Sequence, residues 1–546
     1  MRKIFDRIDA LLEKEKGTIF KEHGGRVKIC LIYPNYYQVG ISNLGFQSVY
    51  RLFNERKDVV CERAFLPEKE EDFVNNPLVS FESKKPLYDF DVLAFSLCFE
   101  NDYPNILKIL KLSKIPYNVS ERDFNYPLLV AGGVLCFSNP EPVANIFDVV
   151  FIGEAEEVVD KFIETYKSVK EGSYEEEFKI NLKKQLINLE GVYIPEAYKE
   201  VYFEEKLTGR RILWNNAPEK IKKVYCKEFS EKFNFSQIIT DEAVFSNMFL
   251  LESMRGCPFS CRFCLVGHIY RPVRKASFEK LKETIERLKP SKIGIIAPSL
   301  TAYSDLKELL KIDGVELSFT SLRADKLTFN ILKDISSQRT ITLAPEAGSE
   351  RLRKIIKKEI TEDNLLLIVE ELKKINIETL KLYFMIGLPF EKDEDVDDIV
   401  KLIKKIRVIF PRRITASVSV FVPKPFTPFQ WHRMEDYERV KEKLKKLKRD
   451  TLAIKGFKLV HEVPKYSYME GYFARGSRQA ISVIEKISEG ENFGKILDEV
   501  KYRLYETKSF EDYLPWDFIE HEGLTKESLW KEYEKAKALA CQTDNI

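Results

Sequence analysis

Three cysteines within eight residues place the strongest limit on what this chain can be. Cys257, Cys261 and Cys264 follow a short apolar run at 249–252. Closely spaced thiols in a chain without a signal peptide favour a metal site over disulfides. Three thiolates can hold three corners of a [4Fe–4S] cluster and leave the fourth iron open. A zinc site would need a fourth ligand, for which His268 is the nearby candidate.

The C-x3-C-x2-C spacing, with Phe263 before the last cysteine, resembles the signature of radical S-adenosylmethionine (SAM) enzymes. The resemblance implies that the open iron binds the amine and carboxylate of SAM. It also implies that an electron from the cluster cleaves SAM to a 5′-deoxyadenosyl radical, and that Phe263 lies at the cofactor. An external electron donor of the flavodoxin or ferredoxin type is then expected as a partner.

His268 follows the cysteines and is the candidate catalytic residue. It could act on a substrate proton, or it could tune the cluster by a hydrogen bond to a sulfur. It could equally be a histidine whose bonds are satisfied locally. The sequence leaves these alternatives open.

Bulk composition bounds the class of protein. A length of 546 residues predicts three or four domains, and a hydrophobic share of 44% is ample for packed cores. The net charge of +2 gives no global field that would recruit nucleic acid. There is no apolar run of transmembrane length and no signal peptide, so we expect a soluble, cytoplasmic protein without a membrane partner.

The N-terminal part alternates apolar runs with stretches of helical spacing. Strands are predicted at 27–33, 92–96, 127–131 and 149–152, and helices at 43–54 and 106–113. Continuous apolar strands separated by helices indicate a parallel sheet covered on both faces. Such sheets bind ligands at the carboxyl ends of their strands, where the polar loops of this region fall.

These loops resemble those of the cobalamin-binding domain that precedes the radical domain in one large branch of the superfamily. The resemblance implies a cobalamin cofactor held by residues of four loops, namely Asn35, Tyr37, Gly40, Ser42, Ser96, Glu100, Gly132, Gly133 and Glu154. A flavodoxin-like nucleotide-binding domain, or a purely structural one, is the alternative.

One position departs from the family pattern. Cobalamin domains that supply a lower cobalt ligand carry D-x-H-x-x-G, whereas this chain has Asn35, Tyr37 and Gly40 in that frame. A neutral phenol is a poor metal ligand beside imidazole. We therefore expect no protein nitrogen below the cobalt, with Tyr37 either holding water or packing in the core.

A second series of apolar runs follows the cysteines. Six strands are predicted at 249–252, 292–297, 315–320, 340–343, 380–385 and 416–421. With helices between them they describe an open (β/α)6 barrel, the scaffold that the resemblance to radical enzymes implies. Chemistry is expected at the carboxyl ends of its strands.

Five residues at these strand ends are candidate SAM ligands. Ser299 stands where many relatives have a Gly-Gly-Glu that binds the methionine amine, so Ser299 or backbone carbonyls would replace it. Ser321 and Arg323 follow the third strand, and Arg323 could fork onto a carboxylate or form a surface ion pair. Glu346 is expected to accept from the ribose hydroxyls. Gly387 lies in a motif on the adenine side.

The predicted fold is α/β, with a mostly helical C-terminal domain. The expected parts are an N-terminal arm (1–25), a Rossmann-like (flavodoxin-like) cobalamin domain (26–160), a connecting segment (161–245), the radical SAM barrel (246–432) and the C-terminal domain (433–546). The charged run at 441–449 predicts an amphipathic helix with a solvated basic face, and RNA binding there is the lesser alternative.

The leading functional hypothesis is methylation of an unactivated carbon of an unknown substrate, with RNA among the candidates. Three alternatives stay open: a cobalamin-assisted rearrangement or ring-forming redox reaction, a tRNA methylthiotransferase-like enzyme with a degenerate N-terminal domain, and a non-catalytic scaffold that binds cluster and SAM.

Overall fold

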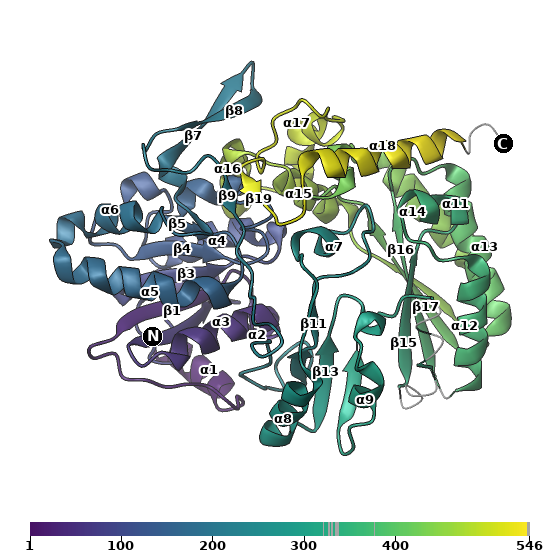
Figure 1. Cartoon of the computed structure of the whole chain (residues 1–546), viewed down its shortest axis with the longest axis horizontal. Coiled ribbons are helices and arrows are strands. Elements are labelled where there is room, and N and C mark those ends of the chain that lie inside the picture. The colour runs from purple at the N-terminus through teal and green to yellow at the C-terminus, as the bar shows by residue number, and fades with distance from the viewer. Residues whose placement is uncertain (320, 326–327, 329–330, 333–337, 376, 543–546) are drawn as a thin grey trace. The chain divides into compact units, whose positions relative to one another are not determined.

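The computed structural model describes residues 1–319, 321–325, 328, 331–332, 338–375 and 377–542 (Figure 1). The chain divides into two compact units. The first contains Met1–Leu251, Arg475–Ile496 and Asp512–Glu522; the second contains Glu252–Ala474, Leu497–Glu511 and the chain from Gly523 onward. The C-terminal region, which the sequence predicts as one helical domain, thus contributes to both units.

A six-stranded sheet of order β2-β1-β3-β4-β5-β6 forms the centre of the first unit. Its strands are β1 (Val27–Tyr33), β2 (Val59–Phe65), β3 (Val92–Ser96), β4 (Leu128–Gly132), β5 (Val149–Phe151) and β6 (Val192–Tyr193). Strands β1 to β5 run parallel, and β6 is antiparallel to β5. The order 2-1-3-4-5 is that of flavodoxin-like folds, which confirms the predicted fold class.

Strand β2 is absent from the sequence prediction because charged residues interrupt its apolar pattern. Arg63 and Glu62 are nevertheless buried. The Arg63 guanidinium lies 2.8 Å from both Glu15 carboxylate oxygens and 2.6 Å from Glu82. Burial alone would raise the pKa of Glu15, but the Arg63 charge and the hydrogen bonds from Arg63, Thr18 and Tyr37 together outweigh it and hold that pKa below its usual value. These contacts fasten the N-terminal arm to β2.

Two pairs of helices cover this sheet. Helix α3 (Leu44–Glu55) packs with α5 (Ala155–Gly172), and α4 (Tyr103–Leu112) packs with α16 (Ile481–Ser488) from the C-terminal region (Figure 1). Every residue of β2, β3 and β5 is buried, as expected for a sheet covered on both faces. The predicted boundary at residue 160 falls inside α5, because that helix continues to Gly172.

The first unit contains further small elements. They are α1 (Arg2–Leu12), α2 (Tyr37–Ile41), α6 (Glu175–Leu186), the hairpin β7 (Tyr198–Phe203) and β8 (Lys206–Ile212), and the paired strands β9 (Ile221–Lys222) and β19 (Ile519–Glu520).

A buried ion pair attaches the C-terminal segment to the first unit. Arg478 donates from Nε to the Glu141 carboxylate at 2.8 Å and from Nη2 to the Tyr193 hydroxyl at 2.7 Å. The Glu141 residue is only 1% exposed. A buried carboxylate of this kind depends on its cation, so the segment is an integral part of the unit.

The second unit is built on two sheets, of order β10-β13-β14 and β15-β16-β17-β18. An isolated parallel bridge between Leu322 and Leu343 joins the chain after β14 to β15. The strands are β10 (Phe249–Glu252), in which the unit boundary falls, β13 (Lys292–Ile296), β14 (Glu316–Phe319), β15 (Thr340–Glu346), β16 (Thr379–Ile386), β17 (Arg413–Val420) and β18 (Phe457–His461). The six predicted strands are present, with residue 320 outside the described ranges.

Strand β18 is a seventh strand that the sequence analysis did not predict. It pairs in parallel with β17. Its residues are half-buried or exposed, so it lacks the apolar pattern that revealed the others.

Helices follow the strands of the second unit. They are α7 (Val266–Ile269), α8 (Phe278–Leu288), α9 (Leu306–Leu310), α11 (Glu350–Ile355), α12 (Glu362–Lys374), α13 (Asp393–Ile409), α14 (Tyr437–Thr451), α15 (Pro464–Ala474), α17 (Phe493–Leu504), which spans a unit boundary, and α18 (Lys526–Gln542). Side chains of Ser277, Thr361 and Asp436 cap the starts of α8, α12 and α14. Across the described ranges, no helix is long and apolar enough to cross a membrane.

Candidate functional site

The three cysteines lie on a tightly folded loop between β11 (Met254–Arg255) and α7. Two glycines make this fold possible. Gly256 has φ +82°, and a Cβ there would lie 2.3 Å from the Tyr270 carbonyl oxygen. A Cβ on Gly267 would lie 2.6 Å from the Phe259 carbonyl oxygen. Neither position has room for a larger residue, so the loop closes on itself only with glycine at both.

All three loop cysteines are free thiols, with Cys261 buried and the other two half-buried. Burial raises the pKa of Cys257, and it raises the pKa of Cys264 to about 11. Such thiols become thiolates when a bound metal supplies positive charge. No three His, Cys, Asp or Glu side chains within the described ranges converge as they would on a single metal ion. A [4Fe–4S] cluster fits three cysteines better, because each thiolate binds a different iron.

Arg323 is the predicted strand-end residue that the structure brings to the cysteine loop. Its Nη1 lies 3.9 Å from Cys261 Sγ, and its guanidinium carbon lies 4.1 Å from the centre of the Phe259 ring. Its Nε is 3.4 Å from the Asp325 carboxylate. The positive charge therefore lies against the loop. Phe263 lies within the cysteine loop, and Ser321 comes two residues before Arg323. Both residues are half-buried.

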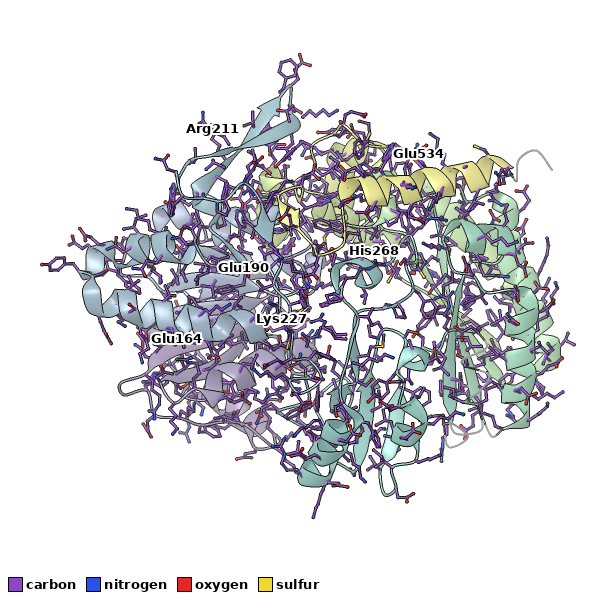
Figure 2. The ribbon with its side chains drawn as sticks, in the orientation of Figure 1. Glu164, Glu190, Arg211, Lys227, His268 and Glu534 are labelled. Carbon is purple, nitrogen blue, oxygen red and sulfur yellow. The ribbon has the colours of Figure 1, made fainter. Side chains whose placement is uncertain are left out.

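His268 lies on the short helix α7 beside the cysteines (Figure 2). It is 4% exposed, and its Nε2 lies 3.2 Å from the Cys261 carbonyl oxygen. A carbonyl only accepts, so the ring donates to it. Burial lowers the pKa of His268 to about 4, which makes the ring neutral at pH 7. The histidine thus supports the loop backbone, and its catalytic role stays a prediction.

Three further predicted residues lie at the carboxyl ends of the barrel strands. Ser299 follows β13, and its hydroxyl is buried without a hydrogen-bond partner among the described residues. Glu346 ends β15, with φ +68° and its carboxylate 3.0 Å from Lys358 Nζ. Gly387 follows β16, with φ +72°. A buried hydroxyl left unpaired costs free energy, so Ser299 fits a polar ligand group.

A buried ion cluster fixes the Gly387 turn. The Gly387 N–H donates to Glu391 Oε1 at 3.0 Å, and Lys443 Nζ lies 2.8 Å from both Glu391 and Glu435. The Lys443 residue is 5% exposed. A solvated basic face was predicted for the run 441–449 as a whole, and Lys443 does not belong to such a face because it is buried. Its spacing from Val440 and Leu447 on the same helix was the signal available.

In the first unit, three loops meet at the carboxyl edge of the sheet. Asn35 follows β1 and donates to Asp102, which follows β3, at 2.7 Å. The Leu97 N–H donates to the Gly132 carbonyl at 2.8 Å. A Cβ on Gly133 would lie 2.4 Å from the Leu97 oxygen, whereas a Cβ on Gly132 would meet nothing within 4 Å. The β1 and β3 loops flank the point where the strand order reverses, at which such sheets bind ligands.

Asp102 is the residue at this edge that the sequence analysis did not select. Burial raises the pKa of Asp102 to about 7, and the Glu100 carboxylate adds to the effect. Ser96 and Glu100, which were predicted, are buried beside it in the chain, with Ser96 Oγ 3.7 Å from Cys98 Sγ. The signal for Asp102 was its place at the end of the same polar loop.

Tyr37 and Gly40 are packed in the core of the first unit. The Tyr37 hydroxyl donates to Glu15 at 2.8 Å, and its ring stacks on Phe81 with centroids 5.5 Å apart. A Cβ on Gly40 would lie 2.5 Å from the Phe65 ring. Tyr37 is therefore a packed core residue, the second of the two predicted alternatives.

Ser42 and Glu154 bind other segments of the first unit. Ser42 Oγ donates to the Gln38 carbonyl and accepts from the Val244 N–H at 2.8 Å. Glu154 accepts from the Cys226 N–H at 2.9 Å. Both side chains thus have structural partners, and their assignment to cofactor binding stays a prediction.

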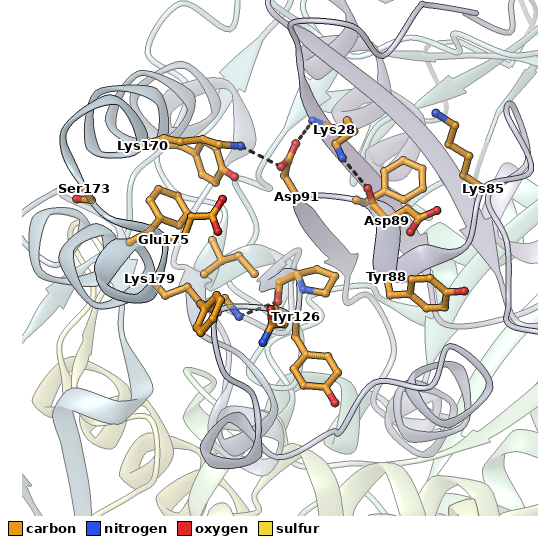
Figure 3. A pocket seen from close by; sticks show the side chains of 17 residues that line it. Lys28, Lys85, Tyr88, Asp89, Asp91, Tyr126, Lys170, Ser173, Glu175 and Lys179 are labelled. Carbon is orange, nitrogen blue, oxygen red and sulfur yellow. Dashed lines mark hydrogen bonds and ion pairs between the residues drawn. The ribbon is translucent and has the colours of Figure 1, made fainter.

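The first unit also contains an open cavity of about 710 Å³ at the amino ends of its strands (Figure 3). Lys28 and Lys170 both contact Asp91 in its wall, and Lys179 donates to the Asp123 carbonyl at 2.7 Å. None of the predicted site residues lines this cavity. It lies at the opposite strand ends from the loops described above.

The barrel and its cysteine loop define a radical SAM protein, and the chain belongs to the radical SAM superfamily. Residues 251–403 match the family described as the radical SAM superfamily, and residues 45–195 match that described as radical SAM proteins, N-terminal. An uncharacterised protein of Methanocaldococcus jannaschii is 31% identical over 482 residues, covering 87% of this chain and 91% of that protein. Membership implies a [4Fe–4S] cluster and SAM as cofactors.

Other known proteins are similar over a smaller part of the chain or at a lower level of identity. A tRNA-2-methylthio-N(6)-dimethylallyladenosine synthase of Pelagibacter ubique is 25% identical over 235 residues, or 39% of this chain and 51% of that enzyme. A solved structure of the cobalamin-dependent S-adenosylmethionine radical enzyme OxsB, with aqua-cobalamin and SAM bound, is 12% identical. It covers 95% of this chain and 80% of that one, with a TM-score of 0.45.

Proposed function

We propose that this chain is a cobalamin-dependent radical SAM enzyme that methylates an unactivated carbon. The observation that carries the proposal is that two sheets of this chain each have an edge of the kind at which ligands bind. A cysteine loop lies at the strand ends of a barrel, and a flavodoxin-like sheet has open, polar loops at its β1/β3 edge. Two such edges suit a reaction that uses two cofactors on one substrate.

Cobalamin at the flavodoxin-like edge is supported by the resemblance of its loops and by their geometry. Gly132 leaves open space where a bulky ligand could approach the backbone. The Tyr37 hydroxyl is bonded to Glu15 in the core, so the position that would supply a lower cobalt ligand offers no side chain to the edge. This supports a cobalamin without a protein nitrogen below the cobalt.

The bound cofactors would supply the chemistry: the cluster and SAM a radical that removes a substrate hydrogen, and cobalamin the methyl group. The chain's own residues bind and orient. Ser299 offers an unpaired hydroxyl, Glu346 a carboxylate that can accept from ribose, and Gly387 a turn fixed by Glu391. Arg323 places a positive charge beside the loop. A flavodoxin or ferredoxin type of protein is the proposed electron donor, in the cytoplasm.

The test is anaerobic reconstitution with iron, sulfide and hydroxocobalamin, followed by measurement of bound cobalamin and its visible spectrum. We expect stoichiometric cobalamin in a base-off form. Gly132→Val should reduce cobalamin binding without changing iron content, because it fills the open position. Gly209→Val on β8, where a Cβ also meets nothing within 4 Å, is the matched control. A full cluster with no cobalamin under any loading condition would refute the proposal.

The reaction itself is tested with SAM that carries a deuterated methyl group. Formation of 5′-deoxyadenosine by the reduced protein would exclude a non-catalytic scaffold. Transfer of the deuterated methyl group to a carbon of a candidate substrate would support methylation. Consumption of SAM to 5′-deoxyadenosine without methyl transfer would favour rearrangement or ring formation.

Methylthiolation of tRNA is the second candidate, and the sequence similarity to tRNA methylthio synthases favours it. Those matches cover about half of each synthase or less. In the first unit the cysteines Cys30, Cys61 and Cys136 are buried, and burial raises the pKa of each thiol. Mass spectrometry of nucleosides from tRNA incubated with the enzyme would detect an added methylthio group.

A further inference from the structure

The cysteine loop is anchored by Arg262, the residue directly after Cys261. The Arg262 N–H donates to the Ile356 carbonyl at 3.0 Å, and its Nη1 donates to the Ile355 carbonyl at 2.7 Å. Its own carbonyl accepts from the Phe429 N–H at 3.3 Å. The side chain is buried. Arg262 thus ties the loop to the end of α11 and to the segment after β17.

The counter-charge of this arginine comes from the last helix of the chain. Glu532 on α18 lies 3.2 Å from Arg262 Nη2 and 3.3 Å from Lys357 Nζ. Burial would raise the pKa of Glu532, but Lys535, Lys357 and Arg262 together lower it to about 2. The carboxylate is therefore ionised throughout the physiological range, and it faces two cations of the barrel.

Helix α18 is held in place without help from Glu532. The Trp530 ring meets Trp431 edge-on, with centroids 5.0 Å apart, and the Tyr533 hydroxyl lies 2.9 Å from His432 Nδ1. Leu529, Tyr533 and Ala536 are buried along the same side. Removing the Glu532 charge should therefore leave the helix docked, because aromatic packing supplies most of the contact.

We infer that Glu532 is a positioning residue for the iron–sulfur cluster, acting through Arg262 on the segment between Cys261 and Cys264. Its carboxylate holds the guanidinium against the α11 carbonyls and compensates the positive charge of the residue that directly follows Cys261. Reduction adds negative charge to a cluster, and nearby net charge sets its potential. The C-terminal helix thereby tunes how readily the cluster accepts an electron. The inference rests on the cluster alone and requires neither cobalamin nor substrate.

The test is a redox titration of the full chain, anaerobically reconstituted with iron and sulfide and followed by electron paramagnetic resonance. Glu532→Gln should raise the midpoint potential, because Arg262 is left uncompensated. We expect about a tenfold change in the reduction equilibrium, or about 59 mV for one electron. Arg262→Gln should lower the potential. Glu534→Gln is the matched control, since Glu534 is exposed on the same helix (Figure 2).

An unchanged potential and spectrum in Glu532→Gln would overturn the inference, as would an equal shift in Glu534→Gln. Thermal unfolding of the cluster-free proteins checks that the fold is retained. Where Glu532→Gln fails to fold, Glu532→Asp replaces it, with the charge kept on a side chain one methylene shorter. A smaller upward shift is then expected, and the wild-type potential with wild-type iron content would refute the role.

Discussion

Replacement of Lys443 by methionine tests whether the ion cluster behind the Gly387 turn is buried. The Lys443 ammonium neutralises Glu391, which is 2% exposed on its side chain. Burial lowers the pKa of Lys443, but Glu391 and Glu435 outweigh it and raise that pKa overall. Burial also raises the pKa of Glu391. Removal of one partner of such a pair costs about 3 to 5 kcal/mol.

The structure also limits this cost. Without Lys443, the buried Glu391 can take up a proton. Protonating a glutamate whose unfolded pKa is about 4.3 costs about 4.4 kcal/mol at pH 7.5 and about 1 kcal/mol at pH 5. A carboxyl whose folded pKa is raised contributes stability below its unfolded pKa and loses it as pH rises. The destabilisation by Lys443→Met should therefore be about 3 to 4 kcal/mol at pH 7.5 and at least about 2 kcal/mol smaller at pH 5.

Urea unfolding at the two pH values, followed by tryptophan fluorescence, measures this difference, since Trp431 and Trp530 lie in the second unit and contribute to the signal. Lys445→Met is the matched control, since Lys445 is exposed on the same helix, and it should unfold like the wild type. SAM binding should weaken in Lys443→Met alone, because Glu391 accepts from the Gly387 N–H. A loss of stability that does not depend on pH would refute the buried-charge reasoning.

Three other substitutions have defined outcomes. Gly256→Ala should lower iron content after reconstitution, because a Cβ would lie 2.3 Å from the Tyr270 oxygen at φ +82°; an unchanged iron content would show that the loop tolerates a side chain. Tyr37→Phe should destabilise the first unit by about 1.5 to 3 kcal/mol in urea unfolding, through its lost bond to the Glu15 carboxylate, and leave cobalamin binding unchanged. Asp102, with its pKa raised to about 7 by burial, contributes stability at acid pH that is lost as pH rises through 7. Asp102→Asn should therefore gain stability relative to the wild type between pH 5 and pH 8, and a constant difference would contradict this.

Strand prediction succeeded where burial is continuous and failed where it depends on distant partners. Strands β1, β3 and β10 have the bounds that their apolar runs predict. Strand β2 was missed because Arg63 is buried through ion pairs with Glu82 and with Glu15, which lies 48 residues earlier in the chain. Hydrophobic periodicity carries no information about such long-range ion pairs.

The same distinction between local and distant signals applies to the residues of the candidate site. The cysteines could be found because their spacing is local. For Asp102 and Lys443 the sequence offers a position in a loop or on a helix but not their partners, since Asn35 and Glu391 lie 67 and 52 residues away. Tyr37 was left between two alternatives, because only the folded chain shows its hydroxyl against Glu15. Residues whose chemistry is set by tertiary burial lie beyond reasoning from a single sequence.

The interleaved course of the chain has a consequence for its synthesis on the ribosome. The first 251 residues emerge long before Arg478, yet their unit keeps Glu141 buried against that arginine and α4 covered by α16. Until then the nascent unit has a carboxylate without its cation and an uncovered helix face. A fragment ending near residue 251 should therefore require chaperones or aggregate. Completion of the first unit must await synthesis of the chain as far as Glu522.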